Sequence, residues 1–219
     1  MKNYILAPSI IAADFAHIAD ELLACESAGA DWIHIDVMDG HFVPTITIGS
    51  LFTQACHRNT KLPLDVHLMI ENPTAQVESF AQAGATNITV HIEACADVEK
   101  VIHQIKSLGC KAGVALKPST SLSEIESVLS IVDIVLIMSV NPGFSGQVFM
   151  PEMAERVKVI RKKLDEIHSN AHLEVDGGIN LQTLPIMKSA GVNVFVTGNA
   201  AFKHKDGSFA GVKELKELL

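Results

Sequence analysis

Short apolar runs alternate with longer amphipathic stretches along the whole chain. The runs are rich in β-branched residues and predict eight strands, at Tyr4–Ser9, Trp32–Val37, Leu64–Leu68, Ile88–His91, Ala112–Leu116, Ile134–Met138, Leu173–Asp176 and Val194–Thr197. Between the strands, apolar residues recur every three or four positions and predict helices at Phe15–Ser27, Ala75–Ala83, Val98–Leu108, Ser123–Ser130, Pro151–His168 and Leu181–Ala190. Strands that alternate with helices are typical of a parallel sheet.

Glycine marks the ends of several predicted helices. Gly29, Gly84, Gly109 and Gly191 each stand just before an apolar run, where a left-handed residue commonly ends a helix. Repeated strand–helix units predict an α/β protein with the (β/α)8 TIM barrel fold, formed as a single domain over residues 1–219. The main alternative is a doubly wound open sheet, but Pro8-Ser9 replaces the glycine fingerprint expected after its first strand.

The composition of the chain indicates which kinds of partner and which cellular compartment to expect. The chain of 219 residues is 48% hydrophobic, which suffices for a large core, and its formal charge of −8 argues against nucleic-acid or anionic-membrane partners. The apolar stretch Tyr4–Ala13 is interrupted by Pro8 and lacks a cleavage site, so we expect a cytoplasmic protein without a membrane span. We expect the thiols to be buried and reduced, because the four cysteines lack the CxxC spacing of metal and redox sites: Cys25, Cys56, Cys95 and Cys110.

Histidines and aspartates stand at the carboxyl ends of three predicted strands. His34 and Asp36 lie two residues apart and share a strand face, His67 ends another strand, and Asp176 ends a third, two residues after Glu174. In a barrel these ends meet at one rim, where active sites lie. Clustered carboxylates repel unless a cation or protons compensate them. The pattern predicts one divalent metal, and this mixture of ligands suits zinc, ferrous iron or manganese without separating them.

Other polar and sulfur-containing residues give weaker indications. Asp65 shares a strand face with His67 and is expected to lie deeper, while Asp39 sits in a turn where a capping role is common; neither is assigned to the catalytic set. His91 ends the fourth strand and is a candidate for supporting a metal ligand. Histidines on helices or the tail are expected to be solvated: His17, His57, His103, His168 and His204. Met38, Met69 and Met138 either fill the core or form a water-poor pocket wall.

Glycine-rich loops follow the last three predicted strands. They contain Gly143 and Gly146, the pair Gly177-Gly178, and Gly198-Asn199. Backbone N–H groups in such loops approach an anion closely, which favours a phosphate site, and Ala200–Phe202 could begin the short helix that often supports it. The long Asn141–Met150 connection is either a lid or a rigid turn, and the sequence leaves both open.

Together these motifs resemble the ribulose-phosphate 3-epimerase family along almost the whole chain. The segments that carry the resemblance are Leu6–Ser9, His34–Pro44, Asp65–Met69, Val140–Phe144 and Val175–Ile179. The resemblance implies that His34, Asp36, His67 and Asp176 hold one divalent metal and that Ser9 and His67 contact the substrate. It implies phosphate contacts at Gly143, Phe144, Ser145, Gly146, Gly177, Gly178, Gly198 and Asn199. This chain departs from the family at two of them, because the family usually has Gly at Ser145 and Ser at Asn199.

The resemblance also implies a reaction, the metal-dependent interconversion of D-ribulose 5-phosphate and D-xylulose 5-phosphate in the pentose phosphate pathway. Configuration at C3 would invert through an enediolate, with Asp36 and Asp176 as acid and base on opposite faces. A 3-epimerase for a six-carbon ketose phosphate such as allulose 6-phosphate is the nearest alternative, followed by a silent phosphosugar-binding or metal-storage barrel. A metal-free lyase or decarboxylase would need a lysine at a strand end, and Lys117 beside Pro118 resembles a surface turn. We expect a homo-oligomer of unspecified size.

Overall fold

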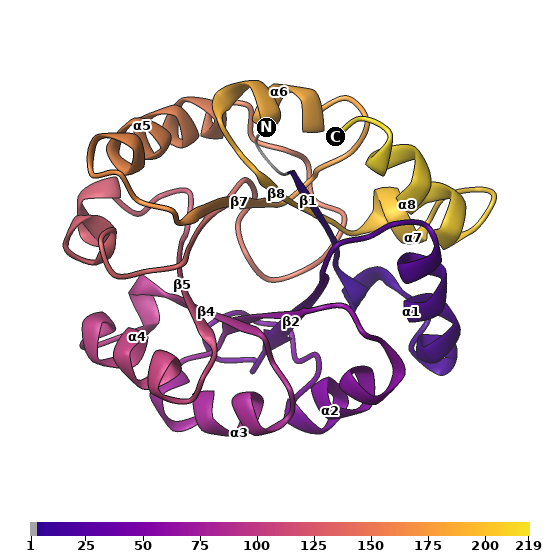
Figure 1. Ribbon diagram of the computed structural model, residues 1–219, viewed down its shortest axis with the longest axis horizontal. Helices are drawn as coiled ribbons and strands as arrows, with labels where there is room; N and C mark the ends of the chain where they lie inside the picture. Colours follow the sequence, from indigo (N-terminus) through magenta and orange to yellow (C-terminus); the bar gives the residue numbers. More distant parts are fainter. Residues whose placement is uncertain (1–3) are drawn as a thin grey trace.

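Eight parallel strands form a ring in the computed structural model, which describes residues 4–219. They are β1 (Ile5–Pro8), β2 (Ile33–Met38), β3 (Leu64–Met69), β4 (Asn87–His91), β5 (Lys111–Leu116), β6 (Ile134–Met138), β7 (His172–Asp176) and β8 (Val194–Thr197). Neighbours in the sheet follow the order β1-β8-β7-β6-β5-β4-β3-β2, and Figure 1 shows the helices surrounding the ring. The predicted barrel is confirmed, and the open-sheet alternative is wrong.

The ring closes between its first two strands in sequence. Ser9 and His34 form a parallel bridge just beyond β1. At the other end of β1, the N–H groups of Asp31 and Trp32 donate to the Leu6 carbonyl at 3.0 and 3.2 Å. This closure places Ser9 beside the polar end of β2.

The helices cover the outside of the barrel. They are α1 (Ile18–Ser27), α2 (Ser50–Asn59), α3 (Val77–Gln82), α4 (Val98–Ser107), α5 (Met153–Glu166), α6 (Leu184–Ala190), α7 (Asn199–Phe202) and α8 (Ser208–Lys216). Short 3-10 helices occupy Ile10–Ala12, Phe15–His17, Pro73–Ala75, Ile92–Ala94 and Leu122–Val128. The glycines predicted to end helices, Gly29, Gly84, Gly109 and Gly191, all have positive φ, as expected of residues that stop a helix and turn the chain toward a strand.

The structure corrects one predicted helix and adds two helices that the sequence did not indicate. The sequence did not indicate α2 or α8. Helix α2 buries only Thr53 and Cys56 and so carries almost no apolar period. The buried apolar side chains of α8 are Val212 and Leu215. The helix predicted at residues 123–130 is a 3-10 helix over Leu122–Val128. Leu122, Ile125 and Val128 recur every third residue, which matches the three residues per turn of a 3-10 helix.

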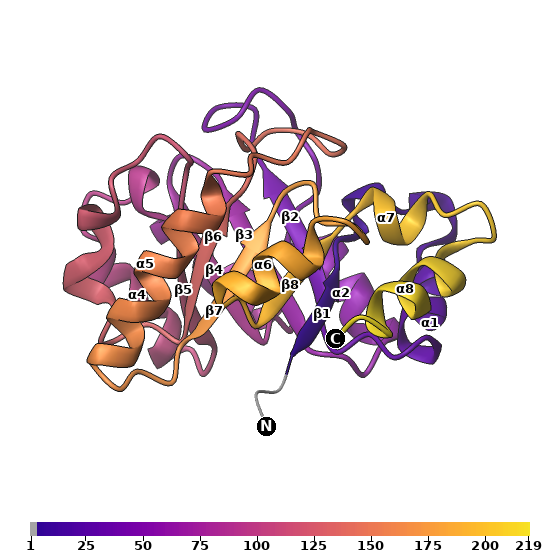
Figure 2. The ribbon, with the colours of Figure 1, turned by 90° about the horizontal axis from the view of Figure 1, so that it is seen from above.

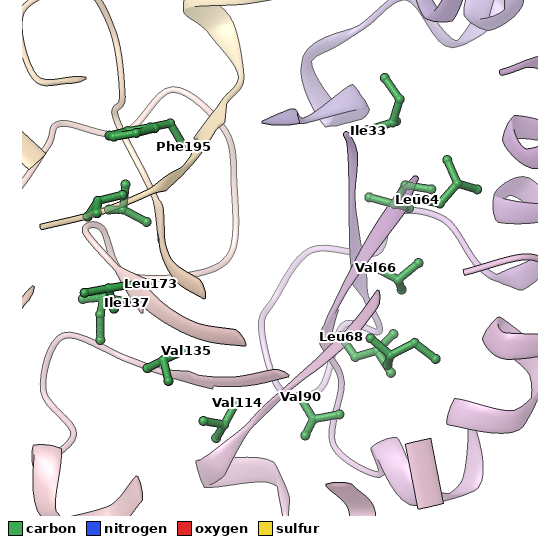
Figure 3. Packing of buried hydrophobic residues seen from close by; sticks show 14 of the residues in the cluster. Ile33, Leu64, Val66, Leu68, Val90, Val114, Val135, Ile137, Leu173 and Phe195 are labelled. Atoms are coloured by element: carbon green, nitrogen blue, oxygen red, sulfur yellow. The ribbon is translucent and has the colours of Figure 1, made fainter. Parts of the chain in front are cut away.

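Successive residues of each strand alternate between two environments. In β2, Ile33, Ile35 and Val37 join the main apolar cluster between sheet and helices, while His34 and Asp36 face the interior of the ring. Figure 3 shows the outward layer, with labelled side chains on the outer side of the strands. The amino-terminal part of the interior holds an apolar cluster that includes Ala7, Ile134, Val194 and Val196.

Two long connections lie over the carboxyl ends of the strands. One follows β2 and the other follows β6, and Figure 2 shows both rising on the side opposite the chain's N-terminus. These connections therefore lie at the ends of the strands that carry Asp36, His67 and Asp176.

The outward apolar layer predicts that two Phe→Ala substitutions change the free energy of unfolding by very different amounts. Phe195 on β8 is fully buried, whereas Phe209 on α8 is 46% exposed. Phe195→Ala removes a ring from the layer between barrel and helices and should lower the free energy of unfolding by about 3–5 kcal/mol, since it leaves a cavity. Phe209→Ala should change it by about 0.5 kcal/mol or less. Urea unfolding followed by circular dichroism measures both, and equal effects would contradict the assignment of the core.

Candidate active site

Polar side chains from three strands converge inside the carboxyl end of the barrel. His34 and Asp36 come from β2, His67 from β3 and Asp176 from β7, and one ligand-type atom of each lies within 4.8 Å of the others. The Asp36 Oδ1 atom lies 3.3 Å from His34 Nε2 and 3.0 Å from His67 Nδ1. The Asp176 Oδ2 atom lies 4.0 Å from His67 Nδ1. The structure thus brings together the four residues that the sequence assigned to a metal.

The spacing and chemistry of these atoms fit a divalent metal ion. Nitrogen and oxygen ligands about 2.1 Å from a tetrahedral ion lie about 3.4 Å from one another, close to the separations around Asp36. The Nε2 atom of His34 is buried and has no hydrogen-bond partner among residues 4–219. A buried imidazole nitrogen without a partner is unfavourable unless another group binds it. An ion held between His34, Asp36, His67 and Asp176 would satisfy this atom and compensate the two carboxylates.

A second acidic layer lies directly behind His34. Asp65 Oδ2 lies 2.7 Å from His34 Nδ1, and Asn87 donates a 3.2 Å hydrogen bond to the other Asp65 oxygen. Glu174 Oε1 lies 3.5 Å from the same His34 nitrogen. A carboxylate on one imidazole nitrogen directs the other nitrogen toward a metal, so Asp65 orients His34. His34, Asp65 and Glu174 also form a possible ligand group, but 2.7 Å is a direct hydrogen-bond distance with no space for an ion between the atoms.

The contacts of this acidic layer with His34 were not among the sequence predictions. Asp65 lies deeper than the ligands, as expected, yet neither its contact with His34 nor that of Glu174 was predicted. The available signal was spacing, because Asp65 and Glu174 stand two residues before His67 and Asp176 and therefore share their strand faces. Spacing along one strand does not reveal which residue of another strand lies alongside.

The other polar residues follow the predictions with one exception. Asp39 accepts hydrogen bonds from the backbone N–H groups of His41, Phe42 and Glu71, a loop-organising role and not a catalytic one. Of the histidines expected to be solvated, His17, His57, His103 and His168 are exposed, but His204 is half-buried. The fold of α8 onto α7, which the sequence did not reveal, places His204 Nε2 3.5 Å from Glu214.

A cavity of about 350 Å³ opens above the cluster. Its lining includes Asp36 and Asp176, whereas His34 and His67 lie behind this surface. Every other residue that the sequence assigned to the substrate or the pocket wall lines it: Ser9, Met38, Met69, Met138, Gly143, Phe144, Ser145, Gly146, Gly177, Gly178, Gly198 and Asn199. The carboxylates therefore face the same space as the glycine loops and the methionines.

Side-chain hydrogen bonds connect the glycine loops. The Ser145 hydroxyl donates to Asn199 Oδ1 at 3.2 Å, so the two residues that depart from the family pattern contact each other. The Gln147 side-chain amide donates to the carbonyls of Asn141 and Phe144, at 2.5 and 3.0 Å, within its own loop. Phe144 at the loop surface is 62% exposed. The loop thus has internal order while it presents an apolar side chain outward.

The two aspartates that face the cavity have pKa values displaced in opposite directions. Burial opposes ionisation of Asp36, but the nearby charge of His34 outweighs it and holds the Asp36 pKa well below its usual range. The Ser9 hydroxyl also donates to Asp36 Oδ2, at 2.5 Å. Burial and the nearby negative charge of Asp36 raise the pKa of Asp176 to about 7. In the metal-free site, one carboxylate is therefore ionised while the other keeps its proton up to about pH 7, which suits an acid–base pair.

Comparison with known proteins identifies the family. The model of the ribulose-phosphate 3 epimerase family matches residues 5–202. The chain belongs to the ribulose-phosphate 3-epimerase family. Ribulose-phosphate 3-epimerase of Synechocystis is 47% identical over 219 residues, which cover 98% of this chain and 95% of the relative. The Bacillus subtilis enzyme of the same name is 48% identical over 202 residues, 92% of this chain and 93% of that protein. The prediction of an epimerase, an isomerase that acts on carbohydrates, is confirmed.

More distant solved structures share the barrel. The protein named KGPDC from Streptococcus mutans superposes with a TM-score of 0.73 over 99% of this chain and 97% of its own, at 14% identity. A 3-hexulose-6-phosphate synthase gives 0.72 over 98% and 99% of the two chains, at 17% identity. At these identities the likeness supports the fold alone. Across residues 4–219, none of the helices combines the length and apolar character that crossing a membrane requires.

The raised pKa of Asp176 predicts a pH-dependent stability for the metal-free protein. Between about pH 4 and pH 7 the folded state keeps the Asp176 proton while the unfolded chain releases it. The free energy of unfolding should therefore fall as pH rises through this window, by at most about 1.4 kcal/mol per unit. Asp176→Asn lacks this contribution, so chelator-treated wild type should lose stability relative to the variant between pH 5 and 7.5 in urea unfolding. Parallel pH dependences of the two proteins would contradict the assignment.

Proposed function

We propose that this protein interconverts D-ribulose 5-phosphate and D-xylulose 5-phosphate by inverting configuration at C3 with the help of one divalent metal. The observation that carries the proposal is that Asp36 and Asp176, from β2 and β7, share one ligand cluster and face one cavity. Membership of the ribulose-phosphate 3-epimerase family supports the same substrate pair. The pathway is then the pentose phosphate pathway.

His34, Asp36, His67 and Asp176 are the proposed metal ligands. When bound there, a divalent cation stabilises the negative charge that develops on the oxygens of an enediolate. The protein orients its ligands beforehand, because Asp65 holds the His34 Nδ1 atom and leaves Nε2 directed at the cluster. Zinc, ferrous iron and manganese all accept this mixture of imidazole and carboxylate ligands.

Asp36 and Asp176 are the proposed acid–base pair. Asp36, held ionised by the charge of the neighbouring His34, can remove the C3 proton from one face of the sugar. Asp176, which lines the same cavity from β7, can deliver a proton to the other face. The roles exchange when the reaction runs in the opposite direction. The Ser9 hydroxyl, beside Asp36, is a proposed substrate contact. His67 lies behind the cavity surface, so we propose that it acts on the substrate through the metal that it would hold.

The glycine loops are the proposed phosphate site. Backbone at Gly143, Phe144, Ser145 and Gly146 after β6, at Gly177 and Gly178 after β7, and at Gly198 and Asn199 after β8 lines the cavity near the two aspartates. At Gly177 an added Cβ would lie 2.7 Å from a Val140 side-chain atom, so only glycine fits this close approach. We propose that a phosphate accepts N–H groups from these loops.

Apolar side chains can exclude water from the reacting carbons. Met38 and Met69 pack with Val43, and Met138 packs with Val140. The three methionines and Val140 line the cavity. These thioethers are proposed as a polarizable wall that does not compete with the hard ligands. The loop over residues 141–150 carries the exposed Phe144 and is proposed to close over the bound sugar.

The wider setting is also part of the proposal. A reducing compartment such as the cytoplasm suits the free cysteines, of which Cys25, Cys56 and Cys110 are buried. The acidic net charge of −8 favours a small phosphosugar partner over nucleic acid or an anionic membrane surface. The homo-oligomer remains a prediction, which the mass in solution would test.

Replacement of either aspartate should remove most of the turnover. Asp36→Asn and Asp176→Asn each delete one proton-transfer group and should lower kcat by at least about 100-fold, since general acid or base catalysis contributes this much or more. Circular dichroism should show that both variants fold. Asp165→Asn, on the outer surface of α5, serves as the matched control and should keep wild-type turnover. A variant at Asp36 or Asp176 that epimerises at near-normal rate would refute the two-carboxylate mechanism.

Solvent exchange tests substrate, reaction and metal dependence together. In heavy water, the protein should incorporate deuterium at C3 of ribulose 5-phosphate, and a chelator should abolish this incorporation until a divalent metal is restored. A six-carbon ketose phosphate offered in parallel should react with a lower kcat/KM. Tight sugar binding without C3 exchange would favour a silent binding barrel, and exchange that survives complete metal removal would contradict the metal requirement.

A further inference from the structure

A chain of hydrogen bonds extends from His67 of the proposed metal cluster to residues that do not line the cavity. His67 Nε2 lies 2.9 Å from His91 Nε2, and His91 Nδ1 lies 3.0 Å from Glu93 Oε2. His91 ends β4, and Glu93 lies in the 3-10 helix Ile92–Ala94 that follows. Both histidines are fully buried. His67 therefore has Nδ1 toward the ligand cluster and Nε2 engaged by a second imidazole.

Glu93 ends this chain as an ionised acceptor. Its Oε1 atom accepts the Lys117 backbone N–H at 2.8 Å and also the Thr120 hydroxyl. Burial disfavours its charge, but the hydrogen bonds from His91, Thr120 and Lys117 outweigh burial and lower the pKa of Glu93 to about 2. An ionised carboxylate accepts hydrogen bonds and donates none. With one proton per ring, the His91 proton must therefore lie on Nδ1, facing Glu93.

The position of that proton determines the state of His67. If His91 carries its proton on Nδ1, its Nε2 atom is an acceptor, and the 2.9 Å contact requires His67 to donate from Nε2. His67 Nδ1 is then unprotonated and faces Asp36 Oδ1 at 3.0 Å. Two acceptors at this distance repel each other unless a cation lies between them.

We infer that His91 and Glu93 are positioning residues that hold His67 in the tautomer able to bind the metal through Nδ1. The inference rests on the proposed metal site and extends it into the second layer of residues. A carboxylate at the end of such a chain also makes the ligating imidazole a stronger electron donor. Neither residue lines the cavity, so neither touches the substrate.

Two loops hold this pair in place. The Phe42 ring, from the connection after β2, lies 4.8 Å from the His91 ring, and the Lys117 ammonium lies over Phe42 at 3.8 Å from its centroid. Lys117, which the sequence suggested was a surface turn, thus contributes its backbone N–H to Glu93 and its side chain to Phe42. The connections after β2 and β5 are thereby joined to the ligand His67.

The substitution Glu93→Gln should reverse the donor and acceptor roles in the hydrogen bonds that connect residue 93, His91 and His67. The amide oxygen is expected at the Oε1 position, where Lys117 and Thr120 donate, so the amide NH₂ group faces His91 Nδ1 and donates to it. His91 must then carry its proton on Nε2, and His67 must carry its own on Nδ1, where the proton competes with the metal. We expect the zinc dissociation constant to rise about 10–100-fold. Glu93→Asp retains the charge and should bind zinc more tightly than Glu93→Gln.

Two measurements test the inference independently of turnover. Competition with a chromophoric chelator gives the zinc affinity of each protein, and Glu99→Gln, in an exposed pair 3.8 Å from His103 on α4, is the matched control expected to keep wild-type affinity. Nitrogen-15 NMR of the zinc-loaded wild type should show His91 protonated on Nδ1 and His67 on Nε2, a readout that does not depend on whether a variant folds.

The outcomes separate this inference from the proposed function. Equal zinc affinity of wild type and Glu93→Gln, or a His91 proton on Nε2 in the loaded wild type, would overturn the positioning role alone. Failure of the wild type to bind zinc, ferrous iron or manganese would overturn the metal site together with its supporting residues.

Discussion

The site depends on the alternation of side chains in a closed ring of parallel strands. Because the side-chain period of a strand is two, a shift of one residue would turn His34 and Asp36 outward into the apolar layer and bring Ile35 inside. The outward layer fixes the register, since Ile33, Ile35 and Val37 are buried against the helices. Packing energy on the outside of the barrel thus holds charged groups on the inside, where they would otherwise be unfavourable. Closure between Ser9 and His34 then adds a hydroxyl to Asp36.

Buried carboxylates in one small volume have different partners and therefore different charges. The charge of His34 and the Ser9 hydroxyl stabilise the negative charge of Asp36, whereas Asp176 meets mainly burial and the field of Asp36. Glu174, with burial and Asp65 against its ionisation, has its pKa raised well above the ordinary value. The same barrel interior thus holds one ionised carboxylate, one carboxyl that keeps its proton up to about pH 7, and a proton-bearing carboxyl behind the His/Asp cluster. A low dielectric environment amplifies each of these differences.

Much of this architecture could be predicted from the sequence, for reasons visible in particular residues. The apolar runs show the period of a strand, and three of them end in the candidate ligands His34 and Asp36, His67, and Asp176. One pattern therefore predicts both the barrel and the cluster. The helix α2 was missed because its few buried residues carry almost no apolar period, and Leu122–Val128 formed a 3-10 helix because its apolar residues recur at three. Contacts between strands, such as Asp65 with His34 or His91 with His67, depend on the register between neighbours, which no single strand encodes. The Ser145–Asn199 contact joins loops far apart in sequence and needed the fold to appear.

Four side chains on three strands are proposed to form one divalent metal site that faces a phosphosugar cavity. Anomalous X-ray diffraction from crystals grown with zinc, recorded on both sides of the zinc absorption edge, tests it most directly. We expect one strong peak about 2.0–2.2 Å from His34 Nε2, from His67 Nδ1 and from a carboxylate oxygen of both Asp36 and Asp176. A cluster that remains free of metal at saturating zinc, or a peak bound only by surface histidines, would contradict it.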